Sequence, residues 1–174
     1  MKLPALDGYV LWLLPDHPSE IRLREPIERI SKTVNAYPFH PHITIGNVPD
    51  IDSGKLIHLL PQIADGIEPF AIQAKSVECR ENPYQKLIIV LESHSRLLKV
   101  ADSIDRIFGK EFGKRDDHHI SILYADLHCS ELSTERENLK KSFSKPFAIN
   151  KIALTRLKGT PDEWEIDKVC ELKG

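Results

Sequence analysis

The sequence has few cysteines, and their spacing does not match a metal site. Cys79, Cys129 and Cys170 are the three cysteines of the 174-residue chain, an odd number without a CxxC pair. Disulfide frameworks use paired cysteines and thiolate zinc sites use closely spaced ones, so the sequence predicts neither. This composition favours a reducing compartment, and we expect a cytoplasmic protein.

Long apolar runs and an excess of one charge are also lacking. The longest apolar runs, at residues 9–14 and 87–91, have the length of strands, whereas a membrane-spanning helix needs about 20 residues. The first residues carry no apolar stretch of the kind that follows the basic start of a signal peptide. With 24 basic and 26 acidic residues, the net charge of −2 argues against a dedicated binder of double-stranded nucleic acid. We therefore expect a soluble protein with no membrane partner and no stable nucleic-acid partner.

The chain repeats itself at an offset of 77 residues, which places His42 on His119. Matches in this one register, without a gap, join residues 42–45 to 119–122, 27–30 to 104–107 and 69–73 to 146–150. Several matches in a single register indicate two structurally equivalent halves. At this length the two halves form one domain, residues 1–174, with a core of its own.

Each half is predicted to have the element order β-α-β-α-β. An apolar strand opens each half, a helix follows, and then come the histidine-containing strand, a second helix and a closing strand. The opening strands are residues 9–14 and 86–91, the second helices are residues 53–64 and about 133–143, and residues 164–172 form a last strand. This order predicts an α+β fold, bilobal and duplicated, with two antiparallel sheets facing a central cleft.

Both halves carry a histidine followed two residues later by a hydroxyl: His42 with Thr44, and His119 with Ser121. In a strand, residues i and i+2 share a face roughly 6.5–7 Å apart, so each motif offers an imidazole beside a hydroxyl. The hydroxyls can donate to phosphate oxygens. Two imidazoles on opposite sides of a phosphorus atom can act as general base and general acid. The pattern therefore predicts metal-free cleavage of a phosphodiester.

A metal site is the main alternative. Its candidate ligands are His40, His42, His118 and His119, with Asp116 and Asp117 beside the second motif. No carboxylate completes an HExxH pattern, and Asp117 takes the place of His40 in the second half, so the ligand set is not repeated. A serine nucleophile at Ser121 would need a Gly-x-Ser-x-Gly turn, which is missing. We expect neither a metal nor another cofactor.

The two motifs resemble those of the two-histidine (2H) phosphoesterase superfamily, and more narrowly those of the cyclic phosphodiesterases of plants and fungi. The similarity extends over nearly the whole chain and includes residues 10–16, the run 119–127 that ends Tyr-Ala-Asp-Leu, and residues 164–165. It implies a bilobal enzyme with a pseudo-twofold cleft. The implied reactions are hydrolysis of nucleoside 2′,3′-cyclic phosphates to 2′-phosphates, and of ADP-ribose 1″,2″-cyclic phosphate, a by-product of tRNA splicing, to ADP-ribose 1″-phosphate.

The resemblance also implies a role for individual residues. It makes His42 and His119 the catalytic pair, with His119 as base and His42 as acid, and it makes Thr44 and Ser121 the phosphate holders. Tyr124 becomes a phosphate or substrate contact, and Trp12 and Tyr84 lie near the nucleoside. Strict alternation would point Tyr124 away from the face of His119, so a bulge or a strand end is required there. The cysteines do not suggest the disulfides that some relatives carry.

Two other functions stay open. The first is an RNA-end 2′,3′-cyclic phosphodiesterase or ligase-like relative that acts on tRNA, and the second is a non-catalytic nucleotide-binding module. Near-neutral charge favours a small cyclic phosphate over a long RNA as the partner. Two titratable groups that face each other favour an enzyme, because a binding module has no need of them. We expect the enzyme to act as a monomer.

Overall fold

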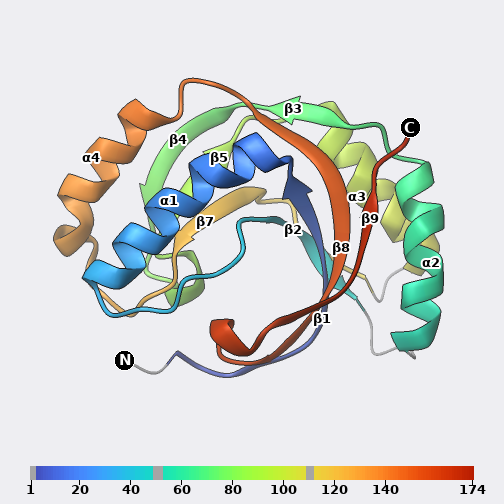
Figure 1. Ribbon diagram of the computed structural model, residues 1–174, viewed down its shortest axis with the longest axis horizontal. Helices are drawn as coiled ribbons and strands as arrows, with labels where there is room; N and C mark the ends of the chain where they lie inside the picture. Colours follow the sequence, from blue (N-terminus) through green and yellow to red (C-terminus); the bar gives the residue numbers. More distant parts are fainter. Residues whose placement is uncertain (1–2, 49–52, 109–111) are drawn as a thin grey trace.

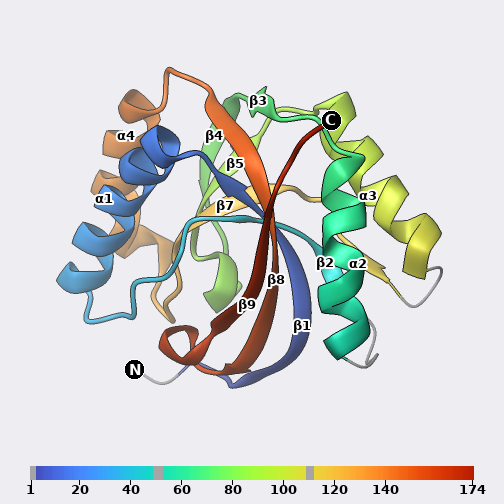
Figure 2. The same ribbon diagram turned by 45° about the vertical axis from the view of Figure 1, so that its right-hand side comes forward.

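The computed structural model describes residues 3–48, 53–108 and 112–174 of the chain. Within these ranges one antiparallel sheet curves through the molecule and α-helices cover it on two sides (Figure 1). Helices α1 and α4 lie together on one side, and α2 and α3 lie together on the other (Figures 1 and 2). No helix among the described residues is long and apolar enough to cross a membrane.

The first half contains the five predicted elements in the predicted order. They are β1 (Leu6–Pro15), α1 (His17–Thr33), β2 (Ile43–Val48), α2 (Ser53–Asp65) and β3 (Phe70–Ile72). The second half repeats them as β5 (Leu87–Leu91), α3 (Ser95–Phe108), β7 (His119–Leu123), α4 (Ser133–Ser142) and β8 (Phe147–Gly159). The α+β prediction and the duplication are confirmed.

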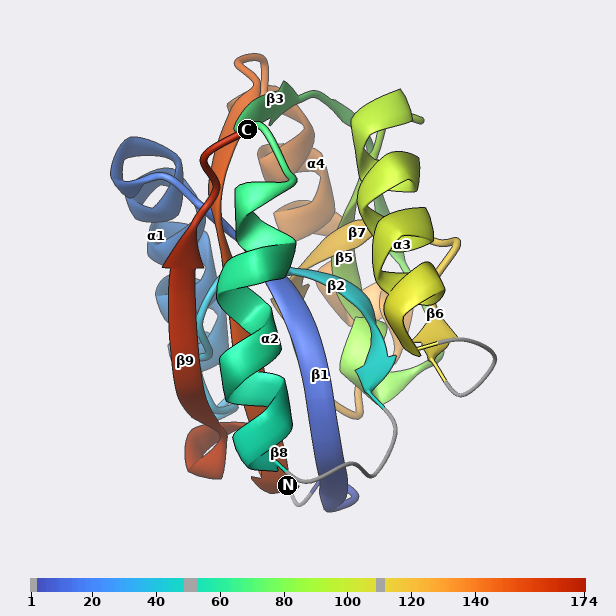
Figure 3. The same ribbon diagram turned by 90° about the vertical axis from the view of Figure 1, so that its right-hand side faces the viewer.

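Several further elements join or extend this repeat. They are β4 (Ala74–Cys79), the 3₁₀ turn η1 (Pro83–Gln85), β6 (Gly113–Lys114), η3 (Cys129–Leu132), η4 (Pro161–Glu163) and β9 (Glu165–Glu171). Strand β9 is the predicted last strand, and it pairs with β8 beside α2 (Figure 3). The short η1 turn, capped by the side chain of Asn82, carries Tyr84.

The strand order is β3-β8-β1-β2-β7-β5-β4, which is nearly symmetric about the contact between β2 and β7. These two central strands are joined at a single residue pair, Ile43 with Ile120. The two predicted sheets are therefore not separate: they are the two wings of one sheet, continuous through this narrow joint. Because the joint lies inside both histidine motifs, the fold brings the motifs together at its pseudo-twofold axis.

Helix α1 shows how the sequence builds the wings. The side chain of Asp16 accepts a hydrogen bond from the backbone N–H of Ser19 at 2.9 Å, which caps the first turn. Leu23, Ile27 and Ile30 repeat at helical spacing and have no exposed surface. Burying each such side chain contributes roughly 1.5–3 kcal/mol. Helix α1 contacts β7 of the other half, so the two halves share one core.

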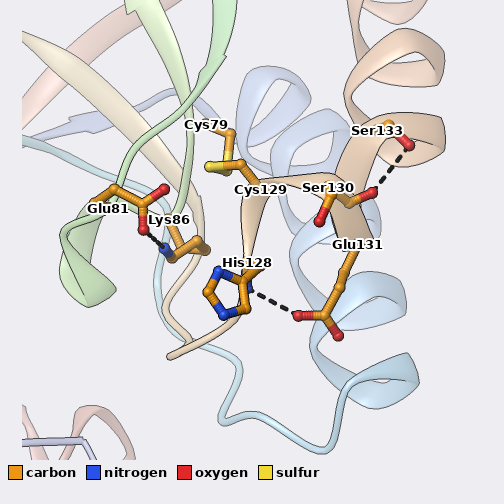
Figure 4. The surroundings of a disulfide bond; sticks show 8 residues. All are labelled: Cys79, Glu81, Lys86, His128, Cys129, Ser130, Glu131 and Ser133. Carbon is orange, nitrogen blue, oxygen red and sulfur yellow. Dashed lines mark hydrogen bonds and ion pairs between the residues drawn. A yellow bond between two sulfur atoms is a disulfide. The ribbon is translucent and has the colours of Figure 1, made fainter.

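The prediction that no disulfide forms is wrong. Cys79, at the end of β4, is bonded to Cys129, at the start of η3, with Cα atoms 5.7 Å apart (Figure 4). The two are separated by 50 residues and become neighbours only through the fold, so no local spacing marks them. Cys170 is free. The cysteine argument for a reducing compartment no longer holds, and the cytoplasmic location stays a prediction.

Candidate active site

A cleft of about 270 Å³ opens over the joint between the two wings. It is lined by all seven residues that the sequence singled out: Trp12, His42, Thr44, Tyr84, His119, Ser121 and Tyr124. The antiparallel pairing of Ile43 with Ile120 explains how both motifs meet here. In that register His42 lies across from Ser121, and Thr44 lies across from His119, so each imidazole faces the other motif's hydroxyl.

Both histidines are held in the same way. The Nδ1 of His42 lies 2.6 Å from the carbonyl oxygen of His40, and the Nδ1 of His119 lies 2.9 Å from that of Asp117. A carbonyl oxygen can only accept, so in each ring Nδ1 carries the proton and donates it. The two acceptors occupy equivalent positions of the repeat. Each histidine is thereby left with Nε2 as the nitrogen available for proton transfer.

The surroundings of His42 are apolar. Its residue is 5% exposed, and its ring is stacked on Trp12 with centroids 3.7 Å apart and planes 11° apart. This burial lowers the pKa of His42 from 6.5 to about 3, although the hydrogen bond to His40 opposes the shift. At neutral pH His42 is therefore a neutral base with its lone pair on Nε2.

His119 has more polar surroundings. Burial lowers the pKa of this histidine too, but the hydrogen bond to the Asp117 carbonyl and the charge of the Asp117 carboxylate both raise it. The carboxylate oxygen Oδ2 lies 3.9 Å from Nδ1 of His119. The positive charges of Arg80 and Arg115 act in the opposite direction. The two catalytic candidates of a symmetric fold are therefore electrostatically different.

Tyr124 reaches the cleft because β7 departs from regular pairing. The register of β7 against β5 shifts between Leu87 and Ile88, and Tyr124 follows directly after the end of the strand. Its hydroxyl lies 3.5 Å from Nε2 of His42. Burial raises the pKa of Tyr124, so the phenol keeps its proton and can donate it to that nitrogen. The strand end that the sequence argument required is present.

Aromatic rings form one wall of the cleft. Trp12, Tyr84, Tyr124 and Trp164 lie with centroid separations of 5.6–6.2 Å, and the Tyr84 hydroxyl donates to the carbonyl of Pro4. Trp164 belongs to the segment that supported the family resemblance, but it was not predicted as a site residue. Other cleft residues that the prediction missed are Leu6, Val10, Asn47, Asn82, Gln85, Arg115, Asp117 and Leu157. For Arg115 and Asp117 a signal was available, since they precede His119 by four and two residues.

The alternative metal ligands do not assemble into a site. Among the described residues no group of three or more His, Cys, Asp or Glu side chains is placed to hold a metal ion. His40 lies beside Glu20, with Nε2 3.6 Å from a carboxylate oxygen, and contacts the carbonyl of Pro41 through Nδ1. Its side chain is therefore engaged away from the His42 and His119 pair.

Paired His-x-[Ser/Thr] motifs that meet at the pseudo-twofold axis of a duplicated α+β fold are typical of the two-histidine phosphoesterases, which the chain resembles. The family described as LigT like Phosphoesterase matches residues 16–90, which include the first motif. A cyclic phosphodiesterase of Arabidopsis thaliana is 22% identical over 173 residues, covering 95% of this chain and 96% of that protein. Both matches are to phosphoesterases, which supports the prediction of an enzyme.

Solved structures share the fold. A crystal structure of E. coli LigT complexed with phosphate matches with a TM-score of 0.54 and 15% identity, covering 98% of this chain and all of that one. A second, complexed with 3'-AMP, matches with a TM-score of 0.56 and 13% identity, covering 97% of this chain and 99% of that one.

Proposed function

We propose that the protein hydrolyses ADP-ribose 1″,2″-cyclic phosphate to ADP-ribose 1″-phosphate, and nucleoside 2′,3′-cyclic phosphates to 2′-phosphates, without a metal ion. The observation that carries this proposal is the matched pair of imidazoles, each with Nδ1 held by a main-chain carbonyl, which leaves Nε2 as the nitrogen for proton transfer. In-line attack on a cyclic phosphate needs a base beside the incoming water and an acid beside the leaving oxygen, on opposite sides of phosphorus. The two motifs supply one such group each.

The hydroxyls provide the phosphate contacts. Thr44 and Ser121 lie across from the imidazole of the opposite motif, where each can donate to a non-bridging oxygen. The hydroxyl of Ser121 donates to the carbonyl of Tyr84 over a long distance, 3.4 Å, and also interacts with the side chain of Tyr124, so it lies where a ligand phosphate can compete for it. Donors aimed at the phosphate oxygens stabilise the charge that develops there in the transition state.

The remaining walls suit a nucleotide. Tyr84 and Trp164 offer rings at the cleft wall, and stacking on such rings is worth roughly 1–3 kcal/mol per base. E. coli LigT has been crystallised with 3'-AMP, and we expect this cleft to accept a ligand of the same size. Arg115 lines the cleft and, among the described residues, has no carboxylate partner, whereas Arg80 is paired with Asp117. A free guanidinium favours a substrate with a second phosphate, as in ADP-ribose 1″,2″-cyclic phosphate.

A product assay tests the proposal. ADP-ribose 1″,2″-cyclic phosphate and 2′,3′-cyclic AMP are offered separately with a strong chelator present, and the position of the phosphate in each product is determined by phosphorus NMR. We expect turnover of both, unchanged by the chelator, with a 2′-phosphate from the mononucleotide. The doubly substituted His42→Ala, His119→Ala protein is the control for contaminating activity. A 3′-phosphate product, or activity that one divalent ion restores, would contradict the proposal.

A further inference from the structure

An ion pair between Arg80 and Asp117 lies beside the second histidine motif. The guanidinium of Arg80, which follows β4, contacts both carboxylate oxygens of Asp117: Nη1 meets Oδ2, and Nη2 lies 3.3 Å from Oδ1. The same guanidinium is held by Glu78 at 3.2 Å and by Gln85 at 3.1 Å. Two-point pairing of this kind fixes the orientation of both groups. Arg80 therefore ties the chain around Asp117 to the segment between β4 and η1.

Asp117 is also the residue that holds His119. Its main-chain carbonyl accepts the Nδ1 proton of His119 at 2.9 Å, and its carboxylate lies 3.9 Å from the same nitrogen. At the equivalent position of the first half stands His40, whose carbonyl likewise holds His42. The side chain of His40 lies beside the Glu20 carboxylate, which is itself paired with Arg24. The residue that holds the second histidine is thus fixed by a two-point pair with an arginine, and the residue that holds the first contacts a carboxylate at a single point.

We propose that Asp117 and Arg80 are positioning residues for His119, because their ion pair holds the Asp117 main chain where its carbonyl keeps the Nδ1 proton and directs Nε2 toward the bound phosphate. Neither side chain takes part in the proton transfer. The acceptor on one ring nitrogen sets the tautomer and the orientation of a histidine. Misplacing a reacting group by about 1 Å can cost about 10²-fold in rate. The inference rests on the proposed function, in which His119 transfers a proton.

The charges around His119 predict the direction in which each substitution shifts its pKa. The groups that face it are Asp117 and His118 on its own segment, Arg115 before it, Arg80 from the β4–η1 segment, and His42 across the joint. The Asp117 carboxylate raises the pKa of His119, whereas Arg80 lowers it. Removing the charge of Asp117 must therefore move the titration of His119 to lower pH. Removing that of Arg80 must move it to higher pH.

The experiment compares Asp117→Asn and Arg80→Gln with the matched control Asp116→Asn, which removes a neighbouring exposed carboxylate that acts on His118 and Lys114 and, among the described residues, forms no ion pair with Arg80 or His119. In both test variants kcat for a cyclic phosphate is expected to fall about 10- to 100-fold, with KM nearly unchanged, as is usual when the support of an active-site histidine is lost. The pH limb of His119 is expected to shift downward in Asp117→Asn and upward in Arg80→Gln. Arg80→Lys, which keeps the charge, should recover part of kcat.

The imidazole titration of His119, followed by NMR in the absence of substrate, separates this proposal from the proposed function. If Asp117→Asn and Arg80→Gln shift the pKa of His119 in opposite directions, the result supports a role of the ion pair in holding His119, even if no cyclic phosphate is turned over. The positioning role is overturned if Asp117→Asn leaves both kcat and the titration unchanged, or if both variants shift the titration in the same direction. It is also overturned if Asp116→Asn loses as much kcat as Asp117→Asn does.

Discussion

The indole of Trp12 lies parallel to the imidazole of His42, with ring centroids 3.7 Å apart. In the part of the chain that the structure describes no aromatic ring is stacked on His119, which lies near the Asp117 carboxylate instead. His42 is consequently the histidine that stays neutral, and His119 is the one that holds a proton more readily. These surroundings favour His42 as the base and His119 as the acid, the reverse of the assignment that the resemblance implies.

The stacking predicts the pH dependence of kcat/KM. The pKa of His42 is near 3 and that of His119 lies below 6.5, so kcat/KM should be highest at mildly acidic pH. It should fall at higher pH, where His119 loses its proton, and at much lower pH, where His42 gains one. Trp12→Leu removes the ring that covers His42, so the acidic limb should move to higher pH while the basic limb stays. A pH–rate series on both proteins measures this, and an unmoved acidic limb in Trp12→Leu would mean that the stacking does not set the pKa.

The roles of the two histidines can be separated with a better leaving group. Loss of either imidazole should lower kcat about 10²- to 10⁴-fold on a cyclic nucleotide, because each removes one proton transfer. A nitrophenyl phosphodiester expels a weakly basic phenolate that needs no acid. Such a substrate should largely restore the activity of His119→Ala and leave His42→Ala impaired. Rescue of His42→Ala instead would restore the opposite assignment, with His119 as the base.

Much of the fold could be predicted because its signals are local or periodic. The 77-residue repeat shows the two halves, and the apolar alternation around each histidine shows which strands carry the site. What joins the halves could not be predicted, since the single pair between Ile43 and Ile120 depends on how two distant strands meet. The same holds for the bond between Cys79 and Cys129.

The same difference between local signals and long-range contacts applies to the candidate site. The cleft contains the seven predicted residues because paired motifs in a duplicated fold must meet at its axis. The difference between the two histidines was not accessible, because it arises from contacts such as that of Arg80 with Asp117, 37 residues apart. Trp164 was missed as a site residue for a related reason: an aromatic residue beside a strand is usually packed in the core, and only the fold shows that this one lines the cleft.

Arg115 should select substrates with a second phosphate. Arg115→Gln removes a cation from the cleft, so KM for ADP-ribose 1″,2″-cyclic phosphate should rise about tenfold and that for 2′,3′-cyclic AMP much less, since a charged hydrogen bond is worth roughly 1.5–3 kcal/mol. Lys168→Gln, an exposed change on β9 outside the cleft, is the control. A dinucleotide that ends in a 2′,3′-cyclic phosphate distinguishes an RNA phosphodiester from a pyrophosphate. Equal losses on all substrates would place Arg115 on the reacting phosphate.

The disulfide should stabilise both the fold and the aromatic wall. Closing a loop between residues 50 positions apart is worth about 4 kcal/mol in the chain-entropy account, so the double variant Cys79→Ser, Cys129→Ser should lose free energy of unfolding on that scale in urea. Tyr84 follows Cys79 by five residues, and Tyr124 precedes Cys129 by five, so the bond also holds the two chain segments that carry these rings. We therefore expect KM for nucleotides to rise in the double variant while the imidazole titrations stay in place.

Cys170→Ser is the matched control for that experiment, because Cys170 is free and lies on β9. It should unfold at the same urea concentration as the unmodified protein. Reduction with dithiothreitol should reproduce the loss in the unmodified protein and have no effect on the double variant. A double variant that is as stable as Cys170→Ser would show that the 50-residue loop is already constrained by other contacts, of which the pairing of β4 with β5 is the strongest candidate.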